Sequence, residues 1–132
     1  MTIPENQRSE LIKYRIGQAG KAMADVEFLI INQRFNLAIN RIYYSIFYLL
    51  SALAIQHQFE TSKHQQLIGW FNKSFVSTGL FNSDIAAIVH KAFSKRSKSD
   101  YSIYAEFGEE ETKALLKELQ IFFEEIKKLI SI

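Results

Sequence analysis

The longest apolar stretch of the chain, Asn36 to Gln56, predicts a helix that is buried on nearly all sides. From Ile42 to Ile55 it carries no charge, and it contains neither Gly nor Pro. A helix that is apolar almost all round has to pack among other helices. One side is nevertheless polar, through residues at or beside a four-residue spacing: Asn36, Asn40, Arg41, Tyr44, Ser45 and Tyr48. We therefore expect functional polar groups on this central helix.

Apolar residues at alternating four- and three-residue spacing predict two further long helices. The first runs from about Arg8 or Ser9 to Asn32, after a loose arm that ends any earlier helix at Pro4. The last begins near Glu109. Their seams are Ile12, Ile16, Ala19, Met23, Val26 and Ile30, and Leu115, Leu119, Phe122, Ile126 and Leu129.

Two shorter helices fill the middle of the chain. One is predicted from about Lys63 to Val76, capped by Thr61 or Ser62, and the other begins after a cap at Asn82 or Ser83. No segment shows the two-residue alternation of a strand. We predict an all-α protein, an antiparallel four-helix bundle with a fifth short helix, formed by residues 1–132 as a single domain.

Composition excludes several classes of function. The chain has 132 residues, a net charge of +2 and no Cys, which excludes disulfides, Cys nucleophiles and Cys-ligated zinc. We expect a cytoplasmic location without membrane partners, because the first residues are polar and the central apolar stretch falls short of the ~20 residues of a membrane span.

Arg41 is the first candidate for chemistry, because a charged residue in a core helix is normally paired. It is suited to binding a phosphate or a partner's carboxylate. The alternative is a structural ion pair with Asp25 or Glu27. The hydroxyl groups of Tyr44 and Tyr48 are more often satisfied core groups than catalytic acids.

The second candidate is the basic run from His90 to Tyr101. It contains Lys91, Lys95, Arg96 and Lys98 within eight residues that include no acid. Such a run attracts phosphates, with Phe93, Tyr101 and Tyr104 available for stacking. The alternative, which charge alone favours, is a solvated helix end. Arg96 differs because it shares a face with Ile85, Val89 and Ala92, so we expect it to point inward with Asp100 as its partner.

Other motifs are missing from the sequence. His57, His64 and His90 are far apart and form no i, i+4 pair, and no glycine-rich phosphate loop or GxSxG motif occurs. We therefore predict no metal site and no cofactor.

Three stretches together resemble the HEPN superfamily, especially its small stand-alone bacterial and archaeal members. They are NRIYYSIFYLLSAL from Asn40, SKHQQLIGWFNKSFVSTGL from Ser62 and KAFSKRSKSDY from Lys91, followed by an acidic helix start at Glu109. The resemblance covers about Arg8 to Leu129. It implies a helical bundle that dimerises, with polar residues of the two protomers meeting in a cleft.

The resemblance also implies two possible functions. Many HEPN proteins are metal-independent ribonucleases of toxin–antitoxin and defence systems, whose site is an Arg followed four to six residues later by a His. Arg96 matches this Arg, but Asp100 and Tyr101 stand where the His would be. Other members pair with a nucleotidyltransferase and are proposed to bind nucleotides.

We therefore favour a non-catalytic or weakly catalytic homodimer that binds nucleotide, RNA or a nucleotidyltransferase partner. The alternative is a toxin-like ribonuclease that uses Arg96 with a partner other than His, such as Tyr101 or Asp100. Tyrosine, with an ordinary pKa near ~10, is a poor base at neutral pH. In either case the side chains predicted to line one cleft are Asn40, Arg41, Tyr44, Arg96, Asp100 and Tyr101.

Overall fold

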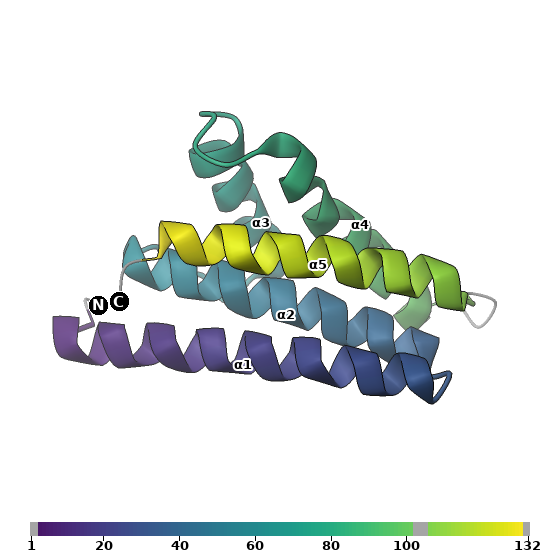
Figure 1. Ribbon diagram of the computed structural model, residues 1–132. Coiled ribbons are helices and arrows are strands. Elements are labelled where there is room, and N and C mark those ends of the chain that lie inside the picture. Colours follow the sequence, from purple (N-terminus) through teal and green to yellow (C-terminus); the bar gives the residue numbers. More distant parts are fainter. Residues whose placement is uncertain (1–2, 102–105, 131–132) are drawn as a thin grey trace.

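The computed structural model describes residues 3–101 and 106–130, without the side chain of Tyr101, and this part of the chain is helical with no strand (Figure 1). The elements in order are α1 (Glu5–Ile31), α2 (Phe35–Gln56), α3 (His64–Phe71), a π-helical turn (Asn72–Val76), α4 (Ser83–Tyr101) and α5 (Glu109–Leu129). The predicted all-α class is confirmed.

Helix α2 is the centre of the fold. It contacts α1, α3, α4 and α5, and α1 runs antiparallel beside it. Its length and composition would suit a membrane span, but 61% of its most apolar window is buried in the bundle. Burial on this scale is what the core helix of a helical bundle shows. The polar Ser45 is fully buried, and its hydroxyl donates to the Ala19 carbonyl 2.8 Å away.

The prediction for the start of α1 is wrong by three residues. The helix begins at Glu5, directly after Pro4, and the Arg8 amide donates to the Pro4 carbonyl at 2.8 Å. Proline is tolerated there because the first helical amides have no acceptor within the helix, so its missing N–H is no loss. The residues assigned to a loose arm therefore include the first turn of the helix.

The first of the two shorter helices, predicted from about Lys63 to Val76, changes its hydrogen-bond register part-way along. α3 ends at Phe71 and continues as a π-helical turn to Val76, before Gly79 adopts the expected left-handed conformation with φ 80°. The predicted caps at Thr61 and Ser62 are wrong, because Lys63 is the capping residue and makes no side-chain cap bond. The Thr61 hydroxyl instead accepts from the Lys63 amide.

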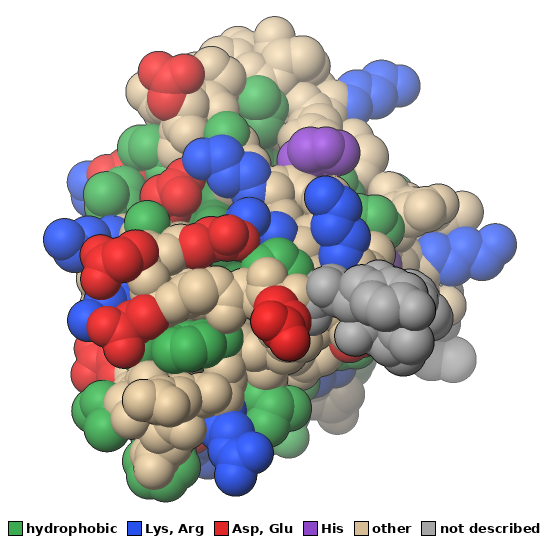
Figure 2. Space-filling model, turned by 90° about the vertical axis from the view of Figure 1, so that its right-hand side faces the viewer, with side chains coloured by type: hydrophobic (Ala, Val, Ile, Leu, Met, Phe, Trp, Pro, Cys, Tyr) green, Lys and Arg blue, Asp and Glu red, His purple; other side chains and the backbone are tan. Residues whose placement is uncertain are grey.

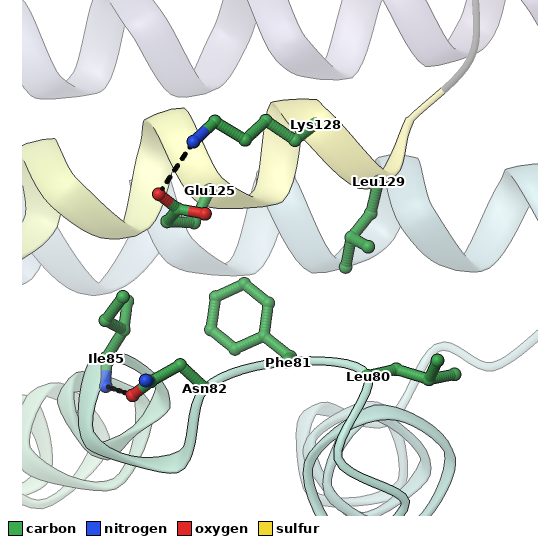
Figure 3. Close-up of a pocket in the computed structure, with 7 residues that line it drawn as sticks. All are labelled: Leu80, Phe81, Asn82, Ile85, Glu125, Lys128 and Leu129. Carbon is green, nitrogen blue, oxygen red and sulfur yellow. Dashed lines mark hydrogen bonds and ion pairs between the residues drawn. The ribbon is translucent and has the colours of Figure 1, made fainter.

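The start of α4 is capped as predicted. Asn82 Oδ1 accepts from the amides of Asp84 and Ile85 at 2.8 and 3.0 Å. Figure 3 shows the loop before this cap, with the Phe81 ring directed toward α5. The polar residues from Ser94 to Asp100 lie inside α4, because this helix continues to Tyr101. Arg96 is thereby held in a helical register against α2.

Candidate functional site

The ring of Tyr44 is contacted by two arginines from different helices. The Arg41 guanidinium carbon, one turn earlier on α2, is 5.3 Å from the ring centroid, and that of Arg96 on α4 is 5.5 Å from it. Arg96 Nη2 also donates to the Tyr44 hydroxyl at 3.4 Å and lies 5.2 Å from the Tyr43 centroid. Packing of α4 on α2 thus places two cations around one phenol.

Asp100 completes the contacts of Arg96. Its Oδ2 is 2.8 Å from Arg96 Nε, one helical turn along α4, and the two side chains are 31% and 21% exposed. The contact is ionic rather than a directed hydrogen bond, since the Arg96 Nε–H has no acceptor in line. The Nε–H of Arg41 is likewise buried without an acceptor among the described residues. The buried donor of Arg41 therefore remains unsatisfied, whereas that of Arg96 is charge-paired with Asp100.

Arg41 borders a hollow of about 310 Å³ between α1 and α2. Its lining side chains are Asp25, Phe28, Leu29, Leu37, Asn40 and Arg41. Asp25 shares the hollow, yet within residues 3–101 and 106–130 no ion pair joins Arg41 to Asp25 or Glu27. The structural alternative for Arg41 is therefore not realised, and Asn40 lies on the hollow side of α2.

The structure brings together four of the six predicted cleft residues, namely Arg41, Tyr44, Arg96 and Asp100. Asn40 lies next to them, in the hollow that Arg41 borders. Tyr101 is the last residue of α4, and its side chain, like the whole of Tyr104, lies outside the described residues. The functional role of the six residues stays a prediction.

Two of the three lysines in the basic run on α4 are paired with acids on α5. Lys91 Nζ lies 2.8 Å from Glu118 Oε1, and Lys95 Nζ lies 2.8 Å from Glu111 Oε1. Figure 2 shows basic and acidic side chains interspersed over one face, with no continuous basic surface there. Lys91 and Lys95 are therefore neutralised by α5, as expected for a solvated helix end, and the arginines at Tyr44 are the cations of the candidate site.

His64 lies beside the same group of side chains, although no motif in the sequence predicts this position. It is the first residue of α3, its Nδ1 is 2.6 Å from the Tyr43 hydroxyl, and its ring stacks on Phe47 with 4.0 Å between centroids. The Tyr44 ring meets the imidazole edge-on at 6.1 Å. The sequence predicted no histidine near Arg96, and the fold supplies one from a different helix.

The surroundings set the protonation states of this pair. Burial lowers the pKa of His64 below its ordinary 6.5, and the positive charge of Arg96 lowers it further. Burial raises the pKa of Tyr43 to about 12, partly opposed by Arg96. At neutral pH the imidazole is therefore uncharged and the phenol keeps its proton.

The chemistry that these groups support is anion binding combined with proton transfer. Guanidinium groups bind phosphate oxygens in a forked geometry, and a neutral imidazole accepts protons near pH 7. Within the described residues, no three His, Asp or Glu side chains gather as metal ligands. Sequence reasoning missed His64 because its contacts, Tyr43, Tyr44 and Phe47, lie 17 to 21 residues away in the chain and on a different helix.

Comparisons with known proteins agree with this architecture. A family model described as the HEPN domain matches residues 12–129. A "UPF0332 protein" of Thermotoga maritima is 34% identical over 125 residues, 95% of each chain. Two proteins of Methanocaldococcus jannaschii, named "Putative toxin MJ0142" and "Putative toxin MJ0605", are 30% and 29% identical. The alignments cover 87% and 92% of this chain, and 78% and 90% of those proteins.

Proposed function

The chain belongs to the HEPN domain family, and on this premise we propose that it is a toxin-like HEPN protein that binds RNA through its phosphates. The observation that carries the proposal is the buried Nε–H of Arg41, which has no acceptor among the described residues and lies close to a second guanidinium, that of Arg96, at the ring of Tyr44. Both guanidinium carbons lie within 5.5 Å of the centroid of the Tyr44 ring, and we propose that one phosphodiester contacts both groups. We take RNA as the source of that phosphate, because many HEPN proteins are ribonucleases and two relatives of this chain are named putative toxins.

The unsatisfied donor of Arg41 favours this part of the protein as a binding site for an anion. Leaving a buried donor without a partner costs about 1–3 kcal/mol, more for a charged group, and such groups call for a specific explanation. A phosphate supplies several acceptor oxygens and a negative charge, which compensates both guanidinium groups at once. The Asp100 carboxylate already occupies one side of Arg96, and it stands in for part of that negative charge.

Aromatic rings beside the arginines are suited to the bases of single-stranded RNA. Tyr44, Phe47 and Tyr48 lie on one side of α2, with 6.1–6.3 Å between the ring centroids of each pair, and all three are partly exposed. Bases stack on such rings without sequence preference, for about 1–3 kcal/mol per base. We propose that these rings hold the nucleotides that flank the bound phosphate.

We also propose that the protein is a homodimer. Large apolar side chains at the α1–α2 end are exposed, with Phe28 at 66%, Ile31 at 79% and Leu37 at 56%. Phe28 and Leu37 also line the hollow beside Arg41. Exposed apolar groups clustered beside a buried charge are typical of an interaction surface. A second copy on this surface would extend the cleft beyond the residues of one chain.

A nucleotidyltransferase partner is the competing proposal for the same donors. Such a protein would present a carboxylate to Arg41 or Arg96, where RNA presents a phosphate. The two ligands are separated by their chemistry, because binding of a carboxylate partner does not depend on RNA. A binding experiment with purified components therefore distinguishes them.

Fluorescence anisotropy with a labelled single-stranded RNA tests the proposal. Arg41→Ala and Arg96→Ala should each weaken binding about 10–100-fold, because a hydrogen bond to a charged group contributes about 1.5–3 kcal/mol and 1.4 kcal/mol is tenfold. Each should also reduce the dependence of log K on log[salt] by about 0.7. Arg15→Ala is the matched control, since Arg15 lies over the exposed ring of Tyr14, 5.8 Å from its centroid.

The control variant should bind RNA as the wild type does. If the wild type does not bind RNA, or if Arg41→Ala and Arg15→Ala behave alike, the proposed RNA site is wrong. Binding of a purified nucleotidyltransferase that is lost with Arg96→Ala, together with no RNA binding, would favour the partner-protein proposal.

A further inference from the structure

We propose that His64 is the proton acceptor for cleavage of the RNA held by Arg41 and Arg96, an inference that rests on the proposed RNA binding. The expected histidine position, after Arg96 on α4, is occupied by Asp100. His64 reaches the same group of side chains from the first turn of α3. The fold thus supplies from another helix the group that the sequence lacks after Arg96.

The imidazole of His64 is held in one orientation. On one side its Nδ1 is 2.6 Å from the Tyr43 hydroxyl, and on another its ring lies nearly parallel to Phe47, at 26°. The proposal requires the tautomer in which Nδ1–H donates to the Tyr43 oxygen and Nε2 carries the lone pair. A hydrogen bond and a stacked ring together fix the direction of that lone pair, as proton transfer at a defined atom requires.

Several titratable or charged groups lie around His64. They are the phenols of Tyr43 and Tyr44 on α2 and the guanidinium of Arg96 on α4, with Arg41 and Asp100 beyond them. Burial and Arg96 both favour the neutral imidazole. A neutral imidazole beside two cations can accept a proton while the cations bind the phosphate.

The nucleophile has to come from the ligand. The nearby hydroxyl of Ser45 is fully buried and donates to Ala19, and the phenol of Tyr43 keeps its proton with a pKa of about 12. Ribose carries a 2′-hydroxyl next to each phosphate, which DNA lacks. The geometry therefore points to RNA as the substrate class and to its own 2′-oxygen as the attacking atom.

The reaction balances without a further reactant. His64 Nε2 takes the 2′-hydroxyl proton, the 2′-oxygen bonds to phosphorus, and the bond from phosphorus to the 5′-oxygen breaks. The leaving 5′-oxygen takes a proton from water, and His64 returns its own to solvent. Arg41 and Arg96 stabilise the charge on the phosphoryl oxygens. The products are a 2′,3′-cyclic phosphate end and a 5′-hydroxyl end.

The test compares a labelled single-stranded RNA with its fully 2′-O-methylated counterpart. We expect the wild type to cleave only the RNA, and to leave a 2′,3′-cyclic phosphate. His64→Gln should cleave at least 100-fold more slowly, since a general base contributes about 10²–10⁴-fold. It should bind the methylated strand within twofold of the wild type. His64→Asn is the second variant, and His57→Gln is the control, since His57 is exposed at the far end of α2.

The pH dependence of the cleavage rate is a second measurement, and a purely structural role of His64 would not change it. Cleavage by the wild type should fall as the pH drops below 6.5, where His64 becomes protonated, and Tyr43→Phe should displace this limb. Cleavage by both His64 variants at the wild-type rate would overturn the inference, as would a wild type that binds RNA and leaves it intact. Failure to bind the methylated strand would instead overturn the proposed RNA binding.

Discussion

Replacing Arg96 with Ala separates a binding arginine from a structural one. The change removes the ion pair with Asp100 and the contacts with the rings of Tyr43 and Tyr44. The ion pair is partly exposed and has i, i+4 spacing, so it contributes about 0.3–0.5 kcal/mol. Each ring contact contributes about 0.5–1 kcal/mol. We expect Arg96→Ala to lower the free energy of unfolding by about 1–2 kcal/mol.

Thermal denaturation measures this loss. For a domain of 132 residues, 1 kcal/mol corresponds to about 3–5 °C in Tm, so a decrease of about 3–10 °C is expected. Asp100→Asn provides the comparison, because it removes the negative charge and keeps the shape. It should cost only a few tenths of a kcal/mol, since the pair is partly exposed. It should also tighten RNA binding, because the carboxylate no longer repels the phosphate.

The result that refutes this reasoning is a large loss of stability with unchanged binding. Breaking a buried, fully paired charge costs about 3–5 kcal/mol. If Arg96→Ala costs that much and leaves RNA affinity at the wild-type value, Arg96 is a structural residue. If Asp100→Asn weakens RNA binding, the carboxylate does not compete with the phosphate for Arg96.

Three further predictions follow from the fold and the site. The folded-state pKa of His64 is below 6.5, so the unfolded chain binds more protons than the folded chain as the pH falls under 6.5. The Tm should therefore decrease from pH 7.5 to pH 5.5, and His64→Gln should make that decrease smaller. Asn82→Ala removes the α4 cap and should cost about 1 kcal/mol in urea denaturation, whereas the exposed Ser83→Ala should cost less. Sedimentation at tens of micromolar should show a dimer that Leu37→Glu dissociates, and a monomer at all concentrations would contradict the proposed dimer.

The helices were predictable because their signals are local. The apolar seam of α5 is buried at Leu115, Leu119, Phe122 and Ile126, and the register of α4 was enough to direct Arg96 inward. The π-helical turn after Phe71 could not be seen, because a change in hydrogen-bond register leaves the apolar spacing almost unchanged.

The candidate site was predictable only in part, for a related reason. Arg41 and Tyr44 are one turn apart on one helix, and Arg96 and Asp100 on another, so each pair follows from helical spacing. His64 reaches the site through the packing of α3 on α2, and a single histidine outside any motif gives no sign of such a contact. The packing of the helices on one another, rather than the spacing of residues within one helix, decides that His64 lies at this site.

In the proposed RNA binding, the ion pairs between α4 and α5 should limit the rate at which RNA is captured. Because Glu118 and Glu111 neutralise Lys91 and Lys95, and the net charge is only +2, the field beyond the surface is weak. Without electrostatic steering, association rate constants are about 10⁵–10⁶ M⁻¹s⁻¹. The arginine variants should then share one association rate and differ in how long the complex lives. Replacing Glu111 and Glu118 with Gln should accelerate capture while leaving that lifetime nearly the same.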